Sequence, residues 1–153
     1  MKLKSLLMHF RSALELTDPS CFKGTCLSVN YFPYACCDHT SLLLAAYLAN
    51  NSFPGAYIIR GIEGGDHHEL NSHVWLELDG LKIDITADQF NRYGYENAPV
   101  IVEKTNVFLS SFGAHNMGLG DFREFLLLHH ASPLMDDFTL SYRTITSIIR
   151  QHS

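Results

Sequence analysis

Long hydrophobic runs are missing from this chain, and no apolar stretch approaches the ~20 residues that a membrane-spanning helix needs. Basic residues are also scarce, with 11 Lys and Arg against 16 Asp and Glu and a net charge of −5. A nucleic-acid-binding surface needs a cluster of positive charge. The composition therefore predicts neither a nucleic-acid partner nor a membrane partner.

Cysteine is sparse as well, and four thiols are few for a disulfide-held scaffold of this size. A bond between the adjacent Cys36 and Cys37 would be strained. We therefore expect reduced thiols and a cytoplasmic location; a Cys21–Cys26 bridge in a secreted form is the alternative. The Cys and His spacings do not match a zinc motif, and no phosphate-binding glycine loop is present. We expect no metal and no other cofactor.

The composition indicates one folded domain over residues 1–153. Apolar residues make up 46% of the chain and charged residues 18%, which excludes disorder. A length of about 150 residues is usual for one domain. Apolar residues recur at helical spacing over residues 2–16, and His9 and Arg11 interrupt them, so this segment predicts an amphipathic helix rather than a signal peptide.

The later segments predict a mixture of helices and strands. Residues 37–50 are apolar nearly all round, which is typical of a helix buried in the middle of a domain. Residues 138–150 fit a helix by spacing, but their threonines favour a strand. The other predicted elements are an irregular segment at 17–35, strands at 56–61 and 100–103, loops at 61–71 and 87–98, and a helix at 122–130. This order predicts an α+β domain with a short antiparallel sheet.

The most informative segment is a hairpin. Residues 72–78 and 81–86 alternate between apolar and polar side chains, and Asp79-Gly80 between them is typical of a two-residue type I′ turn. The register that follows puts one wholly apolar strand face on the core. His73 and Asp84 then become diagonal neighbours on the other face, about 7–8 Å apart between backbones. The six residues of that face are His73, Trp75, Glu77, Lys82, Asp84 and Thr86.

A His–Asp pair of this kind has two interpretations. A carboxylate bonded to one ring nitrogen fixes the tautomer and leaves the other nitrogen to take a proton from a nucleophile. A structural hydrogen bond on an exposed sheet face is the alternative. Cys37 favours catalysis because it begins the buried helix, whose N-terminal partial charge stabilises a thiolate, and a thiol beside a histidine is an activated nucleophile. Cys36 and Cys37 as small buried hydrophobes are the alternative.

Three segments resemble the transglutaminase-like branch of the papain-like cysteine enzymes, and above all its small bacterial members. They are Phe-Pro-Tyr-Ala-Cys-Cys-Asp-His-Thr-Ser at 32–41, Ser-His-Val-Trp at 72–75 and Asp-Ile-Thr-Ala-Asp-Gln-Phe at 84–90. The resemblance implies a papain-like α+β fold, in which a central N-terminal helix bearing the Cys packs on a short antiparallel sheet bearing the His and the Asp. It also implies a catalytic triad of Cys37, His73 and Asp84.

Two positions depart from the family pattern. Ala35 stands where the family usually has a glycine, and the double cysteine offers two nucleophiles. A Gly-x-Cys alignment selects Cys37, which we favour, whereas a Cys-x-Asp pattern selects Cys36 with Asp38.

Further candidates belong to the oxyanion hole or the substrate cleft. Asn30 or Tyr31 lies where papain-like enzymes keep an oxyanion-hole side chain, with the Cys37 amide as the second donor; a loop hydrogen bond is the alternative. Trp75 is expected to shield the His–Asp pair from water or simply to cover the sheet. Asp88 and Gln89 are expected to line the cleft or to cap the turn that follows the hairpin.

The expected reaction is acyl transfer from an amide or ester of a peptide or protein, through a thioester, to water or to an amine. The activity would be that of a peptidase, amidase, deamidase or transglutaminase. The rival hypothesis is a catalytically degenerate domain that binds a peptide or a partner protein in the same cleft.

Overall fold

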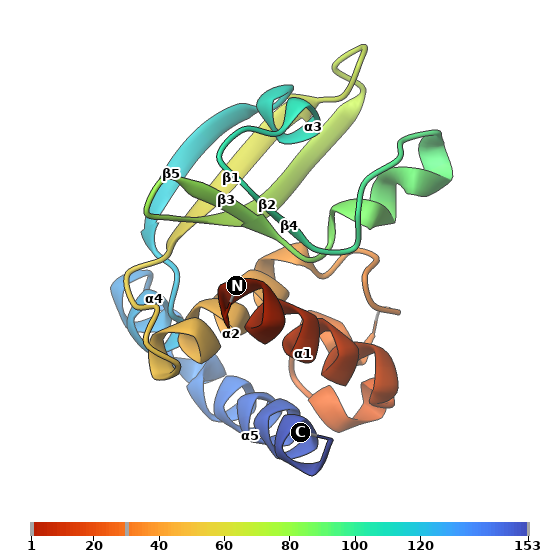
Figure 1. Ribbon diagram of the computed structural model, residues 1–153. Coiled ribbons are helices and arrows are strands. Elements are labelled where there is room, and N and C mark those ends of the chain that lie inside the picture. Colours follow the sequence, from red (N-terminus) through yellow and green to blue (C-terminus); the bar gives the residue numbers. More distant parts are fainter. Residues whose placement is uncertain (1, 30, 153) are drawn as a thin grey trace.

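The computed structural model, which describes residues 2–29 and 31–152, has a five-stranded antiparallel sheet packed on a layer of helices (Figure 1). The strand order is β4-β3-β2-β1-β5. The strands are β1 (Tyr57–Gly64), β2 (Leu70–Leu78), β3 (Leu81–Asp84), β4 (Ile101–Glu103) and β5 (Gly113–Leu119). The predicted α+β class and antiparallel sheet are confirmed.

Helices α1, α2, α4 and α5 lie together on one side of the sheet (Figure 1). The α-helices are α1 (Lys2–Leu16), α2 (Cys37–Asn50), α3 (Val107–Ser110), α4 (Phe122–Leu128) and α5 (Met135–Gln151). Short 3₁₀ segments connect them: η1 (Pro19–Phe22), η2 (Cys26–Ser28), η3 (Ala87–Tyr93) and η4 (Ser132–Leu134). No helix in the described part of the chain combines the length and the apolar character that crossing a bilayer requires.

Helix α2 lies between the sheet and the other long helices, as its apolar surface predicts (Figure 1). Its residues from Thr40 to Leu48 are all buried. Leu7 and Phe10 of α1 and Leu76 and Ile83 of the sheet are fully buried in the same core. Burial of each such side chain contributes roughly 1.5–3 kcal/mol. This core fixes the start of α2, and so Cys37, relative to β2.

The hairpin has the predicted register near its turn. Leu76 pairs with Ile83, Glu77 with Lys82 and Leu78 with Leu81. Asp79 and Gly80 both have positive φ, at 50° and 79°, as a type I′ turn requires. The pairing of β2 with β3 ends at Leu76 and Ile83, so the predicted register does not continue to residues 84–86. On the other side of β2, His73 pairs with Gly61 of β1.

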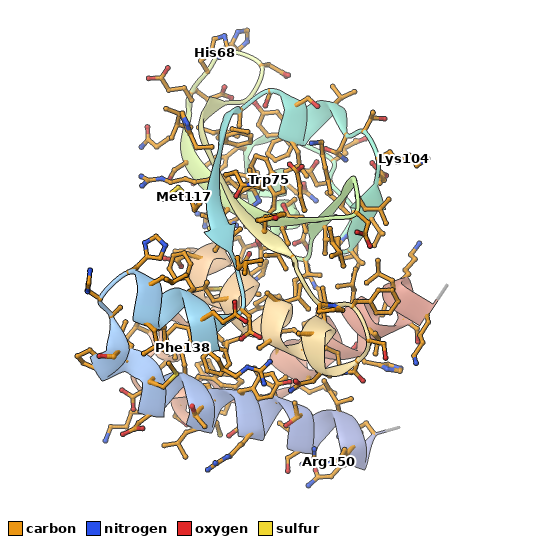
Figure 2. All side chains as sticks on the ribbon, turned by 90° about the vertical axis from the view of Figure 1, so that its left-hand side faces the viewer. His68, Trp75, Lys104, Met117, Phe138 and Arg150 are labelled. Atoms are coloured by element: carbon orange, nitrogen blue, oxygen red, sulfur yellow. The ribbon has the colours of Figure 1, made fainter. Side chains whose placement is uncertain are left out.

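The polar face of the hairpin is covered, which corrects the alternative of an exposed sheet face. A second apolar core packs there and contains Trp75, Phe90 and Phe112. Trp75 lies in the upper part of the molecule in Figure 2, and Phe138 of the first core lies among the helices below. Because η3 and α3 supply part of this second core, the predicted loop at 87–98 is partly a packed 3₁₀ helix.

Residues 138–150 form a helix, which decides the ambiguity in their sequence. Helix α5 buries Phe138, Ser141 and Ile145 at helical spacing. The threonines do not break the helix because their hydroxyls donate to carbonyls four residues earlier. These bonds run from Thr139 to Met135, from Thr144 to Leu140 and from Thr146 to Tyr142.

Three other boundaries differ from the prediction. Strands β1 and β2 extend into the predicted loop at 61–71, so the connection between them covers only residues 65–69. The irregular segment at 17–35 contains η1 and η2. Strand β5 was not predicted, because its sequence Gly-Ala-His-Asn-Met-Gly-Leu has few strand-favouring residues; it is an edge strand fixed by pairing with β1.

Candidate active site

The two adjacent cysteines differ sharply in environment. Cys37 is the first residue of α2, is half-buried and lines a cavity. Cys36 is fully buried, and this burial raises the pKa of the Cys36 thiol to about 12. A thiol of that kind stays protonated and unreactive. The environment of Cys37 therefore suits a nucleophile better than that of Cys36, the alternative nucleophile from the sequence.

All four cysteines are free, so the alternative of a Cys21–Cys26 bridge has no support in the structure. Cys21 is exposed and Cys26 is half-buried.

His73 and Asp84 form the predicted hydrogen bond. The distance from His73 Nε2 to Asp84 Oδ2 is 2.6 Å, and both side chains are almost fully buried, with exposed fractions of 0% and 1%. The other carboxylate oxygen, Oδ1, accepts hydrogen bonds from the backbone N–H and the hydroxyl of Thr86 at 2.8 and 3.2 Å. Thr86 therefore fixes the carboxylate, and the carboxylate fixes the imidazole ring.

The charge on this pair follows from its surroundings. Burial alone lowers the pKa of His73, but the charge and hydrogen bond of Asp84 and the nearby Cys37 thiol outweigh it and raise the pKa to about 10. His73 is thus an imidazolium at neutral pH, paired with a carboxylate. The Cys37 thiol acts on the pKa of His73 even though no contact between the two meets hydrogen-bond geometry.

His73 Nδ1 is buried and has no hydrogen-bond partner among the described residues. Three aromatic rings surround the imidazole, at centroid distances of 5.0 Å for Phe90, 5.8 Å for Trp75 and 5.9 Å for Phe112. Trp75, predicted to shield the pair, is 1% exposed and packs against it. The second core thus excludes water from the ring, which lies close enough to Cys37 for the thiol to affect its pKa.

Gln89 holds the segment that precedes Cys37. Its side-chain oxygen accepts from the Ala35 backbone N–H at 3.3 Å, and its side-chain nitrogen donates to the Thr86 carbonyl at 3.0 Å. Ala35 has φ of +55°, in the left-handed region that favours glycine. A glycine would adopt this conformation without strain.

Asp88 has a structural contact instead of a place in the cavity. Both of its carboxylate oxygens accept from the Arg11 guanidinium at 2.7 Å. Arg11 also donates to the Ile85 and Pro99 carbonyls at 2.8 and 3.0 Å, so it joins α1 to the end of the hairpin. The interpretation of Asp88 as a cleft residue is therefore replaced by an ion pair that holds the turn after Asp84.

The two oxyanion-hole candidates from the sequence have no support as such. Asn30 lies outside the described residues, and Tyr31 is 79% exposed. The start of α2 offers another donor, since its N-cap residue Cys36 makes no side-chain capping bond. The first amides of a helix have no intrahelical acceptor, so the Cys37 N–H is the better candidate.

Cys26, Asp38 and His39 form the group of possible metal ligands found in the described part of the chain, with ligand atoms within 4.8 Å of one another. The hydrogen bonds of the His39 ring favour a structural role over metal binding. His39 Nδ1 accepts from the Cys26 backbone N–H at 2.9 Å, so the ring proton is on Nε2, which lies 3.7 Å from the Cys26 sulfur. A protonated nitrogen has no lone pair for a metal. The ring is neutral, and burial lowers its pKa.

The cavity at Cys37 has a volume of about 600 Å³. It extends from the start of α2 between the strands β1, β2 and β5 on one side and the segment α4–η4–α5 on the other. Gln89 and Phe90 line it as well, so the cavity adjoins the residues around His73 without including that ring.

Sequence reasoning missed the roles of Arg11 and of the rings of Phe90 and Phe112. The sequence did indicate that Arg11 is unusual, because it follows Phe10 and lies four residues after Leu7 on the apolar face of α1. A charge at such a position requires a buried partner. Comparison of the chain with protein-family models, curated proteins and solved structures gives no match.

Proposed function

We propose that this chain is a papain-like cysteine enzyme of the transglutaminase-like branch that transfers an acyl group from an amide or ester. Cys37 is the nucleophile, His73 the general base and acid, and Asp84 the residue that orients and charges His73. The acceptor is water or an amine, and the substrate is a peptide or protein.

One observation carries the proposal: a fully buried His73–Asp84 ion pair leaves Nδ1 unpartnered on the side of a helix-start cysteine. A buried ring nitrogen without a partner costs free energy. A purely structural His–Asp pair would give no benefit in return for that cost, whereas a catalytic histidine needs the nitrogen free. The influence of the Cys37 thiol on the pKa of His73 adds a second link between the residues.

The reacting state is the ion pair in which His73 Nδ1 already carries the proton and the Cys37 sulfur is a thiolate. The thiolate attacks the substrate carbonyl carbon, a C–S bond forms, and the carbonyl π electrons move to oxygen, where the Cys37 amide stabilises them. Collapse of this intermediate breaks the bond to the leaving amine or alcohol, which takes the proton from Nδ1. The thioester then reacts with water or an amine, which gives its proton to Nδ1, and the thiolate is released.

Alkylation by iodoacetamide at pH 6 tests the nucleophile, and the chain supplies its own controls. Mass spectrometry measures the rate at each cysteine separately. Cys37 is expected to react at least tenfold faster than the exposed Cys21, because the charged His73 nearby favours the Cys37 thiolate. The buried Cys36 should react more slowly than either. The change His73→Ala should bring Cys37 to the rate of Cys21.

Activity is then measured with p-nitrophenyl esters. Cys37→Ala should abolish turnover, whereas Cys36→Ala should keep most of it. Equal alkylation rates at Cys37 and Cys21, or no effect of His73→Ala, would contradict the proposal and favour a non-catalytic binding domain. Modification confined to Cys36 would show that Cys36, and not Cys37, is the nucleophile.

A further inference from the structure

The lining of the cavity at Cys37 is mostly apolar. Its apolar side chains come from α2, the sheet and the segment α4–η4–α5, and they include Leu42, Ile58, Val74, Leu126, Leu134 and Phe138. Besides Cys37, the polar side chains of the lining are Asp38, His39, Arg60, Ser72 and Gln89.

Some apolar side chains of the lining also reach the surface of the molecule. Met117 of β5 and Leu134 of η4 both line the cavity and are 39% and 37% exposed. In Figure 2, Met117 lies on the strand above α4, and Phe138 lies below that helix. Exposed apolar side chains around a cavity that is also apolar inside mark a binding site for an apolar group.

Cys37 lines the cavity, so the carbonyl carbon of a substrate bound at the Cys37 sulfur stands at the edge of the cavity. The acyl group is bonded to that carbon and stays on Cys37 in the thioester after the leaving group has departed. A cavity that adjoins Cys37 is therefore placed to hold the acyl group through both halves of the reaction.

We propose that this cavity selects a large apolar acyl group whose carbonyl carbon lies at the Cys37 sulfur, an inference that rests on the proposed function. A hydrophobic amino-acid residue of a peptide and a medium-length fatty acyl chain share this chemistry. The volume of about 600 Å³ is in the range of small-molecule sites and accommodates either group.

The kinetic test compares p-nitrophenyl acetate, butyrate and octanoate. Each methylene buried in the cavity should raise kcat/KM about three- to fourfold, so the octanoate, with six more methylenes, should exceed the acetate by about 10³. Leu134→Asp should lower the ratio of octanoate to acetate by about tenfold. Leu128→Asp is the matched control, because Leu128 is 68% exposed on the neighbouring α4 and does not line the cavity; it should leave the ratio unchanged.

A binding test separates this inference from catalysis. Calorimetry with the Cys37→Ala protein measures binding of N-methyloctanamide, of N-acetylphenylalanine methylamide and of N-methylacetamide. Tighter binding of either apolar amide than of N-methylacetamide supports the cavity, and the tighter of the two identifies a lipid-like or a peptide acyl source. Equal binding of all three overturns it.

The two proposals fail in different ways. Cys37-dependent turnover with no preference for long chains would overturn the apolar acyl site and leave the acyl-transfer function standing. Binding of the apolar amides with no turnover of any ester by the wild-type protein would support the site and overturn the enzymatic function.

Discussion

Replacing Asp84 by Asn removes the charge that holds His73 as an imidazolium while keeping an oxygen for the two bonds from Thr86. Without the carboxylate, burial dominates and the pKa of His73 should fall below its ordinary value of 6.5. His73 is then neutral in the folded variant at pH 7. The loss of a buried ion-pair partner costs about 3–5 kcal/mol of stability.

The sign of the pH dependence should also change. In the wild-type protein the pKa of His73 is raised to about 10, so above pH 6.5 the folded state holds a proton that the unfolded state has released. The wild-type stability from this group is therefore fully present below pH 6.5 and falls by about 1.36 kcal/mol per pH unit, or roughly 2 kcal/mol by pH 8. In the variant the group costs nothing above pH 6.5 and destabilises the fold below it.

Urea unfolding at pH 5, 6.5 and 8 measures both curves, with Trp75 as the probe because it is the only tryptophan and is buried beside His73. The matched control is Asp121→Asn, which removes a carboxylate paired with Arg123 at a helix start, where Asn caps equally well. Its stability curve should run parallel to that of the wild type. Parallel curves for Asp84→Asn as well would refute the charged His73–Asp84 pair and the reasoning built on it.

Three further changes test the framework of the site by urea unfolding. Ala35→Gly should stabilise the protein by up to about 1 kcal/mol, since relief of a left-handed alanine exceeds the entropy that glycine adds to the unfolded chain; a loss of stability would contradict this. Arg11→Ala should cost about 3–5 kcal/mol because it leaves the Asp88 carboxylate unpaired, and a cost below 1 kcal/mol would count against the clamp. Gly61→Ala should cost about 1–3 kcal/mol, because the new methyl would lie 2.5–2.7 Å from two aromatic side chains, whereas Gly113→Ala on the adjacent strand has room and should cost less; equal costs would contradict the packing argument.

The parts of this site that the sequence predicted are those that local rules determine. The turn at Asp79-Gly80 and the alternation of the strands were enough to put His73 and Asp84 on one face, and their bond is present at 2.6 Å. The apolar surface of residues 37–50 was enough to predict a central helix that starts at Cys37. Each inference needed only a few neighbouring residues.

The parts that the sequence did not predict depend on contacts between distant segments. The second core over the hairpin joins Trp75 to Phe90 and Phe112, and nothing in the spacing of these residues indicates that they meet. The same is true of Asp88, whose partner Arg11 lies 77 residues away. Strand β5 also depends on a distant segment, because its pairing with β1 outweighs the weak strand preference of its own residues.

These long-range contacts converge on one short segment, residues 84–89. Asp84 holds His73, Thr86 holds Asp84, and Gln89 holds the backbone of Ala35 just before Cys37. In the same segment, the Ile85 carbonyl and the Asp88 carboxylate both accept from Arg11 of α1. A displacement of this segment would therefore move the His–Asp pair and the backbone just before Cys37 together. The sheet and the helix layer are joined where the proposed reaction would require their relative positions to be fixed, which gives a physical reason for a buried arginine and a left-handed alanine so close to one site.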